Sequence, residues 1–336
     1  GVVVSTPNGA PPRVFLLGDL NIDLVFELSE PLRSGGDGLA TSHRVSVGGS
    51  ATNTAVILRR LGFDAVLLAA TGADPWAEQI HALLRAERID LTHVVELPEQ
   101  PTFLNVVAVT PDGERTMLGH RGASVEYRAA DLPEEAIATC ALLHVSGYAL
   151  MDKPQSTAAE RAVEVARAAG VPVSLDVPVD PARHRPSVFR DALAWTDLLS
   201  IGVPEAVELV GQREPRAACA ELHRLGASTV ALKRGVEGTV MSRGGDWSEV
   251  PGLPVPTVDT TGAGDAFAAG AIAATIAGLP LARIGAIANL FGAAAVGTLG
   301  AGRSLPTLRQ VQALARDLGG HDVGGHALDG LADLLA

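Results

Sequence analysis

Short apolar runs alternate with longer amphipathic stretches along most of the chain. Residues 13–19 and 65–70 have the pattern of buried strands, whereas residues 49–61 and 76–87 carry apolar side chains at helical spacing. The alternation continues with strands predicted at 142–145, 171–176, 198–201 and 229–232, and helices at 158–168 and 216–225. Strands separated by helices of this length predict parallel βαβ units, and therefore an α/β fold with a doubly wound, mainly parallel sheet.

Two segments, residues 25–47 and 102–118, interrupt this alternation because they have strand patterns without helices between them. The second contains the turn Pro111-Asp112-Gly113 and predicts a hairpin. Inserted between βαβ units, they predict a small β-sheet lid over the carboxyl ends of the main strands, where open α/β folds bind ligands. We expect one domain over residues 13–318, with flexible or peripheral tails at 1–12 and 319–336.

The C-terminal third contains a long Ala/Gly-rich stretch, residues 266–300, which is the most membrane-like part of the chain. Pro280 and Arg283 interrupt it, so two buried helices fit it better than a membrane span. A further short helix is expected over residues 328–335.

The amino-acid composition of the chain limits the classes of function that it can have. A hydrophobic content of 47% and a charged content of 19% are ordinary for a globular enzyme. The net charge of -12 argues against nucleic acid or anionic membranes as partners. Cys140 and Cys219 are too few for a disulfide framework or a zinc site, and their apolar surroundings predict buried thiols. The first residues do not resemble a signal peptide, so a cytoplasmic location is expected.

The first candidate chemical motif is a glycine loop, Gly262-Ala263-Gly264, followed by Asp265 and a strongly helical segment. Backbone N–H groups at a helix N-terminus form an anion site, and Asp265 beside it could accept the proton of a hydroxyl nucleophile. Asp265 could instead simply cap the helix. A dinucleotide-binding fingerprint fails because Phe267 stands at the third glycine position, and no Walker A sequence occurs.

A second glycine motif, Val47-Gly48-Gly49-Ser50-Ala51-Thr52-Asn53, lies at the start of the helix predicted over 49–61. The two glycines permit close approach by a ligand, and the Asn53 amide can both donate and accept hydrogen bonds to hydroxyl groups. Ser50 as an ordinary helix cap is the alternative.

The two motifs, in this order and about 210 residues apart, resemble the two signatures of the PfkB carbohydrate kinase (ribokinase-like) family. The resemblance covers roughly residues 13–316, and its more specific part is the string Asp259-Thr260-Thr261-Gly262-Ala263-Gly264-Asp265. It implies a ribokinase-like fold and ATP-dependent phosphorylation of a small molecule, with Mg²⁺ as cofactor.

The resemblance implies a role for each matching residue. Asp265 matches the catalytic base, and Gly262, Ala263 and Gly264 match the anion hole for the transferring phosphoryl group. Substrate contacts are implied for Asp23, Gly48, Gly49 and Asn53. ATP contacts are implied for Lys233, Gly235, Gly238 and Asn289, although Lys233 stands where the family usually has Thr. The resemblance also implies a monovalent cation, with K⁺ as the ion that suits these ligands, held by Asp259, Thr261, Ala295, Thr298, Gly300 and Ser304.

Departures from the family pattern bear on magnesium and on the acceptor. The Asn-x-x-Glu motif associated with Mg²⁺ retains Glu205 but has Gly202 in place of Asn. Ribokinases place Lys at the position of Ser50, and a sugar-binding Glu after the strand at 142–145, where this chain has Ser146-Gly147-Tyr148. Ribose is therefore not the favoured acceptor.

Few aromatic side chains are available in the lid region to stack on a base, namely Phe26, Phe103 and Tyr127. This favours a sugar or sugar acid as acceptor over a nucleoside, and a nucleoside kinase of the same fold remains the alternative. The basic residues Arg115, His120 and Arg121 could meet an acceptor carboxylate or phosphate, or form a solvated face. A non-catalytic sugar-binding protein and an NAD-dependent dehydrogenase are further alternatives, and a homodimer through the lid is expected from the resemblance.

Overall fold

A nine-stranded sheet forms the centre of the computed structural model, which describes residues 10–255, 262–296 and 305–318. Its strand order is β13-β12-β11-β10-β9-β8-β1-β4-β5. The strands are β1 (Arg13–Leu17), β4 (Asp64–Gly72), β5 (Val94–Leu97), β8 (Leu142–Ser146), β9 (Val173–Asp176), β10 (Leu198–Gly202), β11 (Thr229–Lys233), β12 (Thr239–Arg243) and β13 (Asp246–Val250). Neighbouring strands from β5 to β11 pair in parallel, and β12 and β13 extend the sheet as antiparallel strands. The predicted α/β class with a mainly parallel sheet is confirmed.

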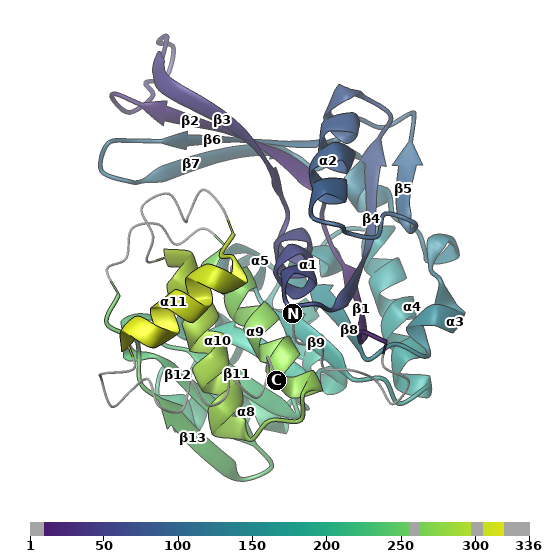
Figure 1. Cartoon of the computed structure of the whole chain (residues 1–336), viewed down its shortest axis with the longest axis vertical. Coiled ribbons are helices and arrows are strands. Elements are labelled where there is room, and N and C mark those ends of the chain that lie inside the picture. The colour runs from purple at the N-terminus through teal and green to yellow at the C-terminus, as the bar shows by residue number, and fades with distance from the viewer. Residues whose placement is uncertain (1–9, 256–261, 297–304, 319–336) are drawn as a thin grey trace.

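Helices cover both faces of this sheet (Figure 1). One face packs against α1 (Ser50–Arg60), α2 (Pro75–Ala86), α9 (Ala263–Ile276), α10 (Leu281–Val296) and α11 (Leu308–Leu318). The other packs against α3 (Glu134–Ile137), α4 (Gln155–Ala168), α5 (Val179–His184), α6 (Pro186–Ala192), α7 (Val203–Val210) and α8 (Pro215–Arg224). In β1, Val14 and Leu16 contact the first set while Phe15 and Leu17 contact the second, so this central strand is buried on both faces.

A separate four-stranded sheet projects from the body as a lid (Figure 1). It consists of β2 (Asn21–Leu28), β3 (Ala40–Gly48), β6 (Phe103–Val109) and β7 (Arg115–His120), in the order β3-β2-β6-β7. The predicted hairpin corresponds to β6 and β7, which pair antiparallel from Leu104↔His120 to Val109↔Arg115. The sheet begins at Asn21, earlier than the predicted lid boundary at residue 25.

The Ala/Gly-rich stretch forms α9 and α10, which separate at Pro280 as predicted. Small side chains let the two helices approach closely, because a Cβ atom at Gly270 would lie only 3.1 Å from Ala288 Cα. Within the described ranges, no helix is both long and apolar enough to cross a membrane. The helix predicted over 328–335 lies outside the described residues.

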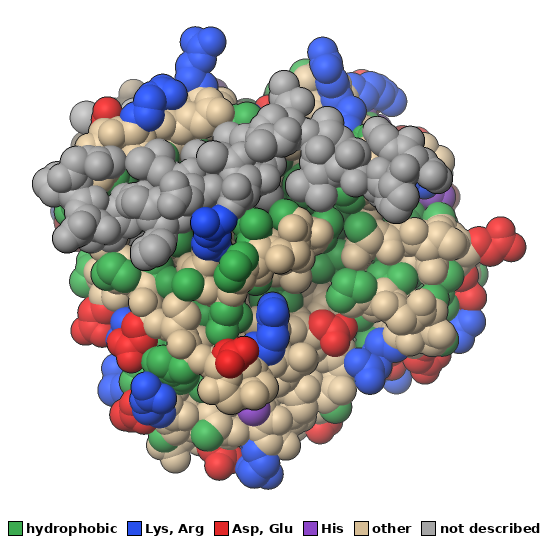
Figure 2. All heavy atoms as spheres, turned by 60° about the horizontal axis from the view of Figure 1, so that its bottom comes forward, with side chains coloured by type: hydrophobic (Ala, Val, Ile, Leu, Met, Phe, Trp, Pro, Cys, Tyr) green, Lys and Arg blue, Asp and Glu red, His purple; other side chains and the backbone are tan. Residues whose placement is uncertain are grey.

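Charged side chains of both signs are interspersed on the face of the molecule in Figure 2, without a broad basic area there. Both cysteines are buried and unpaired, as predicted.

Candidate active site

Asp265 lies in the first turn of α9, which starts directly after Gly262. Gly262 has φ 73°, a left-handed conformation that glycine adopts without strain, and this turns the chain into the helix. The N–H of Ala266 donates to Gly262 O at 2.8 Å, so the backbone N–H groups of the residues between them have no helical acceptor. Together with the positive end of the helix dipole, they form a potential anion site beside the Asp265 carboxylate.

Two side chains of α1 hold the Asp265 carboxylate. Ser50 Oγ donates to Oδ1 at 2.6 Å, and Asn53 Nδ2 donates to Oδ2 at 2.7 Å. A third contact, from Thr54 Oγ1 to the Asp265 carbonyl at 3.3 Å, ties the same helix to the backbone of α9. The two glycine motifs of the sequence, far apart along the chain, therefore meet at one carboxylate.

The environment of Asp265 disfavours its charged form. Burial raises the pKa of its carboxyl group to about 6, and the negative charge of Asp176 adds to the rise. The hydrogen bonds from Ser50 and Asn53, and the positive charge of Lys233, oppose it. A carboxylate with a pKa closer to neutrality is a stronger base than an ordinary aspartate, yet is ionised at pH 7.

Asp23 lies on β2 of the lid, beside the first glycine motif. A Cβ atom at Gly48 would stand 2.3 Å from Asp23 Oδ2, so only glycine leaves room for that oxygen. Asn21 Nδ2 and Asn105 Nδ2 donate to the other oxygen, Oδ1, at 2.7 and 2.9 Å. Burial raises the pKa of Asp23, while these two amides and Arg44 counteract the rise.

Gly49 brings the start of α1 against the end of β1. It has φ 106°, and a Cβ atom there would lie 2.2 Å from Asp19 O. A side chain at this position would be strained and would clash with backbone, so Gly49 fixes the path by which Ser50 and Asn53 reach Asp265.

Arg121, which follows β7, does not point at a free space for an acceptor anion. Its Nε and Nη2 atoms donate to the two carboxylate oxygens of Asp19 at 3.0 and 2.8 Å, and Nη1 donates to Asp152 at 2.7 Å. Gln155 also contacts both partners, accepting from Arg121 at 2.9 Å and donating to Asp19 at 3.1 Å. These bonds join the lid to the main sheet.

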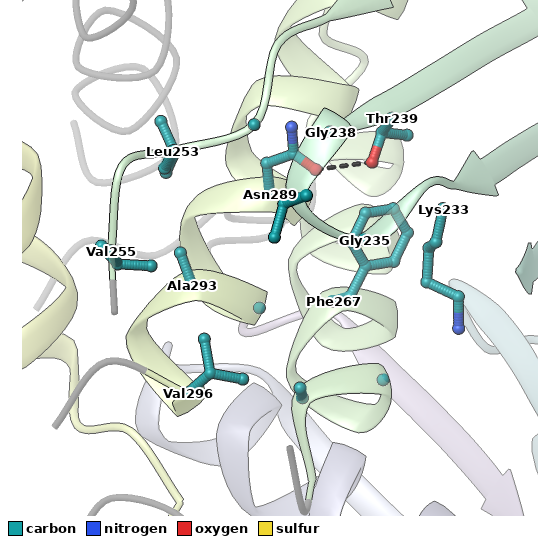
Figure 3. A pocket seen from close by; sticks show the side chains of 15 residues that line it. Lys233, Gly235, Gly238, Thr239, Leu253, Val255, Phe267, Asn289, Ala293 and Val296 are labelled. Carbon is teal, nitrogen blue, oxygen red and sulfur yellow. Dashed lines mark hydrogen bonds between the residues drawn. The ribbon is translucent and has the colours of Figure 1, made fainter. Parts of the chain in front are cut away.

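A cavity of about 500 Å³ opens on the other side of the anion site. All four residues expected to contact ATP line it, namely Lys233, Gly235, Gly238 and Asn289. Ala263, Gly264 and Phe267 of α9 line the same cavity, and Figure 3 shows the Phe267 ring beside Lys233 and Gly235. A volume of this size is typical of a pocket for a nucleotide or another small molecule.

Lys233 extends from the end of β11 toward the start of α9. Its Nζ atom lies 3.6 Å from where a Cβ of Gly264 would stand, and 5.8 Å from the centre of the Phe267 ring. Asn289 is engaged by the protein instead, since its Oδ1 accepts from Thr239 Oγ1 at 2.5 Å and its Nδ2 donates to Pro251 O at 3.2 Å (Figure 3). The Lys233 ammonium group thus lies beside the anion site, while the hydrogen bonds of Asn289 stabilise the wall of the cavity.

Glu205 lies at the start of α7, and its carboxylate covers Gly202. A Cβ atom at Gly202 would stand 2.2 Å from Glu205 Oε2, so the carboxylate occupies space that an Asn side chain would need. Among the described residues there is no cluster of three or more metal-ligating side chains. Mg²⁺ in kinases keeps several waters and takes one or two carboxylates plus substrate phosphates, so a single carboxylate near the anion site is a fitting donor.

Five of the six positions expected to hold a monovalent cation lie outside the described residues: Asp259, Thr261, Thr298, Gly300 and Ser304. The sixth, Ala295, is buried on α10.

Sequence reasoning missed Asn105 and Asp176 as site residues. Asn105 is a polar side chain within an apolar strand, and Asp176 is a carboxylate at the carboxyl end of β9. Both positions are typical of ligand-binding residues, but neither belongs to the two glycine motifs. Asp176 Oδ2 lies 3.3 Å from Ser50 Oγ, which bonds Asp265. Tyr127, considered as a base-stacking residue, is fully buried in the core and cannot meet a ligand.

Comparison with known proteins agrees with this geometry. Residues 12–308 match the family model described as pfkB family carbohydrate kinase. The chain is 31% identical to a fructokinase of Klebsiella pneumoniae, over 88% of this chain and 96% of that protein. It is also 31% identical to an ATP-dependent ribose-1-phosphate kinase of Halopiger xanaduensis, over 90% of this chain and 97% of that protein.

The fold is shared with solved structures. One is an E. coli protein provisionally assigned as ribokinase II, solved in complex with ATP and Mg²⁺. It has a TM-score of 0.79 and 23% identity, covering 91% of this chain and 99% of that one.

Proposed function

The chain belongs to the pfkB family of carbohydrate kinases, and on this premise we propose how it acts. It transfers the γ-phosphoryl group of ATP to a hydroxyl group of a sugar-type acceptor, with Asp265 as the base. The observation that carries the proposal is the position of Asp265 between the nucleotide-sized cavity and the polar residues of α1 and the lid.

The reaction uses groups that already face one another. Asp265 accepts the proton of the acceptor hydroxyl, whose oxygen forms a bond to the γ-phosphorus as the bond to the β,γ-bridging oxygen breaks and ADP leaves. Backbone N–H groups of the loop from Gly262 to Gly264 stabilise the negative charge on the phosphoryl oxygens, and Lys233 adds a positive charge there. Asp23, Gly48, Gly49 and Asn53 hold the acceptor hydroxyls.

Mg²⁺ is a proposed cofactor, and Glu205 would help to hold it together with the ATP phosphates. Bound there, it would neutralise charge on the phosphates. Potassium as a second activator remains a prediction from the family resemblance.

A homodimer through the lid is also proposed. The edge strand β7 exposes Met117 and Leu118, at 57% and 75% of their full accessible surface. Exposed apolar side chains on an edge strand favour association with a second sheet. Light scattering of the purified protein would test this, and a monomer at micromolar concentration would contradict it.

ADP release in the presence of a panel of sugars, sugar acids, sugar phosphates and nucleosides tests the catalytic proposal. We expect Asp265→Asn to lower kcat by about 10²- to 10⁴-fold, the usual contribution of a general base, with the fold preserved. The fold should survive because Asn can still accept from Ser50, and the Asn53 amide can rotate to offer its oxygen. Full turnover in that variant would exclude Asp265 as the base.

A further inference from the structure

Resting on the function proposed above, we propose that Asp176 is a further acceptor-recognition residue, and that it restricts the acceptor to an uncharged polyol. The family resemblance assigned no role to this residue. Acceptors that carry a carboxylate or a phosphate are rejected.

Asp176 stands at the carboxyl end of β9, directly beside the base. Its Oδ2 lies 3.3 Å from Ser50 Oγ, and the same hydroxyl donates to Asp265 Oδ1 at 2.6 Å. A single hydroxyl proton is thus placed between two carboxylates, and it is committed to Asp265. Because one hydroxyl carries one proton and the shorter bond goes to Asp265, the longer contact leaves Asp176 Oδ2 able to accept a hydrogen bond from an acceptor hydroxyl.

The other oxygen of Asp176 faces the interior of the protein. His144 Nε2, on a ring that is 1% exposed, lies 3.3 Å from Asp176 Oδ1, without the alignment of a hydrogen bond. His144 Nδ1 is itself held by Ser174 Oγ at 2.6 Å. In register across the neighbouring strands, Ser146 and Ser200 flank Asp176. The carboxylate is thus fixed among neutral hydroxyls and an imidazole, and no basic side chain within the described residues forms an ion pair with it except that histidine.

Asp23 repeats this arrangement on the lid side of the site. One oxygen accepts from two amides, and no hydrogen bond from the described part of the chain ends on the other, Oδ2, which lies over Gly48. Three carboxylates, Asp23, Asp176 and Asp265, consequently surround the Gly48-Gly49-Ser50 turn. Carboxylates accept hydrogen bonds from sugar hydroxyls and repel a second anion.

The basic side chains of this region engage other carboxylates. Arg121 is bonded to Asp19 and Asp152, and Arg44 on the lid pairs with Glu27 at 3.1 Å, with Arg115 beside the same pair. Lys233 lies on the nucleotide side, among the residues that line the cavity. At the Gly48-Gly49-Ser50 turn itself, an anionic acceptor would therefore meet carboxylates.

Tyr148 lies near the same carboxylates. Burial raises the pKa of its hydroxyl to about 12, and the charges of Asp176, Asp180 and Asp265 add to the rise. Its side chain remains 40% exposed, so an aromatic face is available beside the carboxylates for the apolar face of a sugar ring.

The test measures kcat/KM for matched acceptors at saturating MgATP: fructose, ribose and adenosine as neutral acceptors, and gluconate, 2-keto-3-deoxygluconate and ribose 1-phosphate as anionic ones. We expect the best neutral acceptor to exceed every anionic one by at least 100-fold. A carboxylate or phosphate ester as the best acceptor would overturn the inference while leaving the kinase function intact. Lack of ADP release with all of them would overturn both, and the ratio of sugar to adenosine identifies which polyol is used.

Variants isolate Asp176. Asp176→Asn, an isosteric change, should raise KM for the neutral acceptor at least 10-fold and leave KM for ATP within about 2-fold of its original value. The ratio of kcat/KM for anionic acceptors to kcat/KM for neutral acceptors should rise at least 10-fold. Asp191→Asn is the matched control, because this side chain is exposed on α6 and the change should leave every constant unchanged. If Asp176→Asn left acceptor KM and the ratio unchanged, or altered ATP and acceptor binding equally, Asp176 would not recognise the acceptor.

Discussion

The acid limb of the pH–rate profile tests the Asp265 environment most directly. With the pKa of its carboxyl group raised to about 6, Asp265 is half ionised at pH 6. At pH 5 about a tenth of the molecules would carry the active carboxylate, whereas an aspartate with an ordinary pKa would be about nine-tenths ionised there. We expect kcat/KM for the acceptor at pH 5 to fall to about a tenth of its plateau above pH 7.

The measurement requires saturating MgATP at every pH, so that titration of the nucleotide does not mimic that of the enzyme. Ser50→Ala provides the internal control. It removes a hydrogen bond to the charged form of Asp265, so the acid limb should move to higher pH. A profile that stays flat from pH 8 to pH 5 would refute the raised pKa, and an unmoved limb in Ser50→Ala would refute the role of that hydrogen bond.

The same shift makes a prediction about folding stability, with a sign opposite to the usual case for a carboxylate. Because the folded-state pKa exceeds the ordinary value of 3.8, the folded protein binds more protons than the unfolded chain between pH 4 and 6. The free energy of unfolding should fall as pH rises through that window, by roughly 1–3 kcal/mol for a pKa raised by about two units. Urea titrations at pH 5 and 7.5 should show that Asp265→Asn removes this decrease.

Three further predictions concern the anion site, the ion pair of Arg121 with Asp19, and the monovalent cation. Gly264→Val should abolish ATP binding in calorimetry, because the valine side chain would fill the anion site. The protein should stay folded, because a Cβ at this position meets only Lys233 Nζ, at 3.6 Å. Unchanged ATP affinity would contradict the anion site. Arg121→Met should cost about 3–5 kcal/mol in urea unfolding by leaving the buried Asp19 carboxylate without its partner, and a loss below 1 kcal/mol would contradict the structural role. Turnover should be higher in potassium than in tetramethylammonium chloride at equal ionic strength, and equal rates would exclude the cation site.

Local pattern was enough to predict the elements that carry the site. The strand at β1 and the helices α1 and α2 were expected from apolar periodicity to within two residues at each end. Pro280 correctly separated α9 from α10, since proline cannot continue a helix interior. By contrast, β12 and β13 were not predicted. Both strands are only five residues long and mixed in polarity; β12 is nevertheless buried, whereas β13 is partly exposed at the sheet edge. Antiparallel pairing of β12 with β11, and of β13 with β12, rather than local preference makes them strands.

Contacts between distant segments could not be read from the sequence. Arg121 and Asp19 are 102 positions apart, and only the docking of the lid brings the guanidinium onto that carboxylate. The sequence left open whether Arg121 meets an acceptor anion or solvent, and it does neither. Asn105 likewise gains a role from the parallel register of β2 and β6, which places it opposite Asp23.

The presence of Ser50 where ribokinases have lysine acquires its meaning from the same geometry. A lysine at this position would bring a positive charge between Asp176 and Asp265, lower the pKa of the base, and give an anionic acceptor a partner. Ser50 instead offers one neutral donor, used by Asp265 at 2.6 Å. Lys233, which lies on the nucleotide side, is then the one positive charge that lowers the pKa of Asp265 among the causes of its shift, while burial and the Asp176 charge raise it. Ser50 thus links two properties, the raised pKa of Asp265 and an acceptor site lined by carboxylates. In Ser50→Lys, the pKa of Asp265 should therefore fall and the preference for neutral acceptors should weaken together.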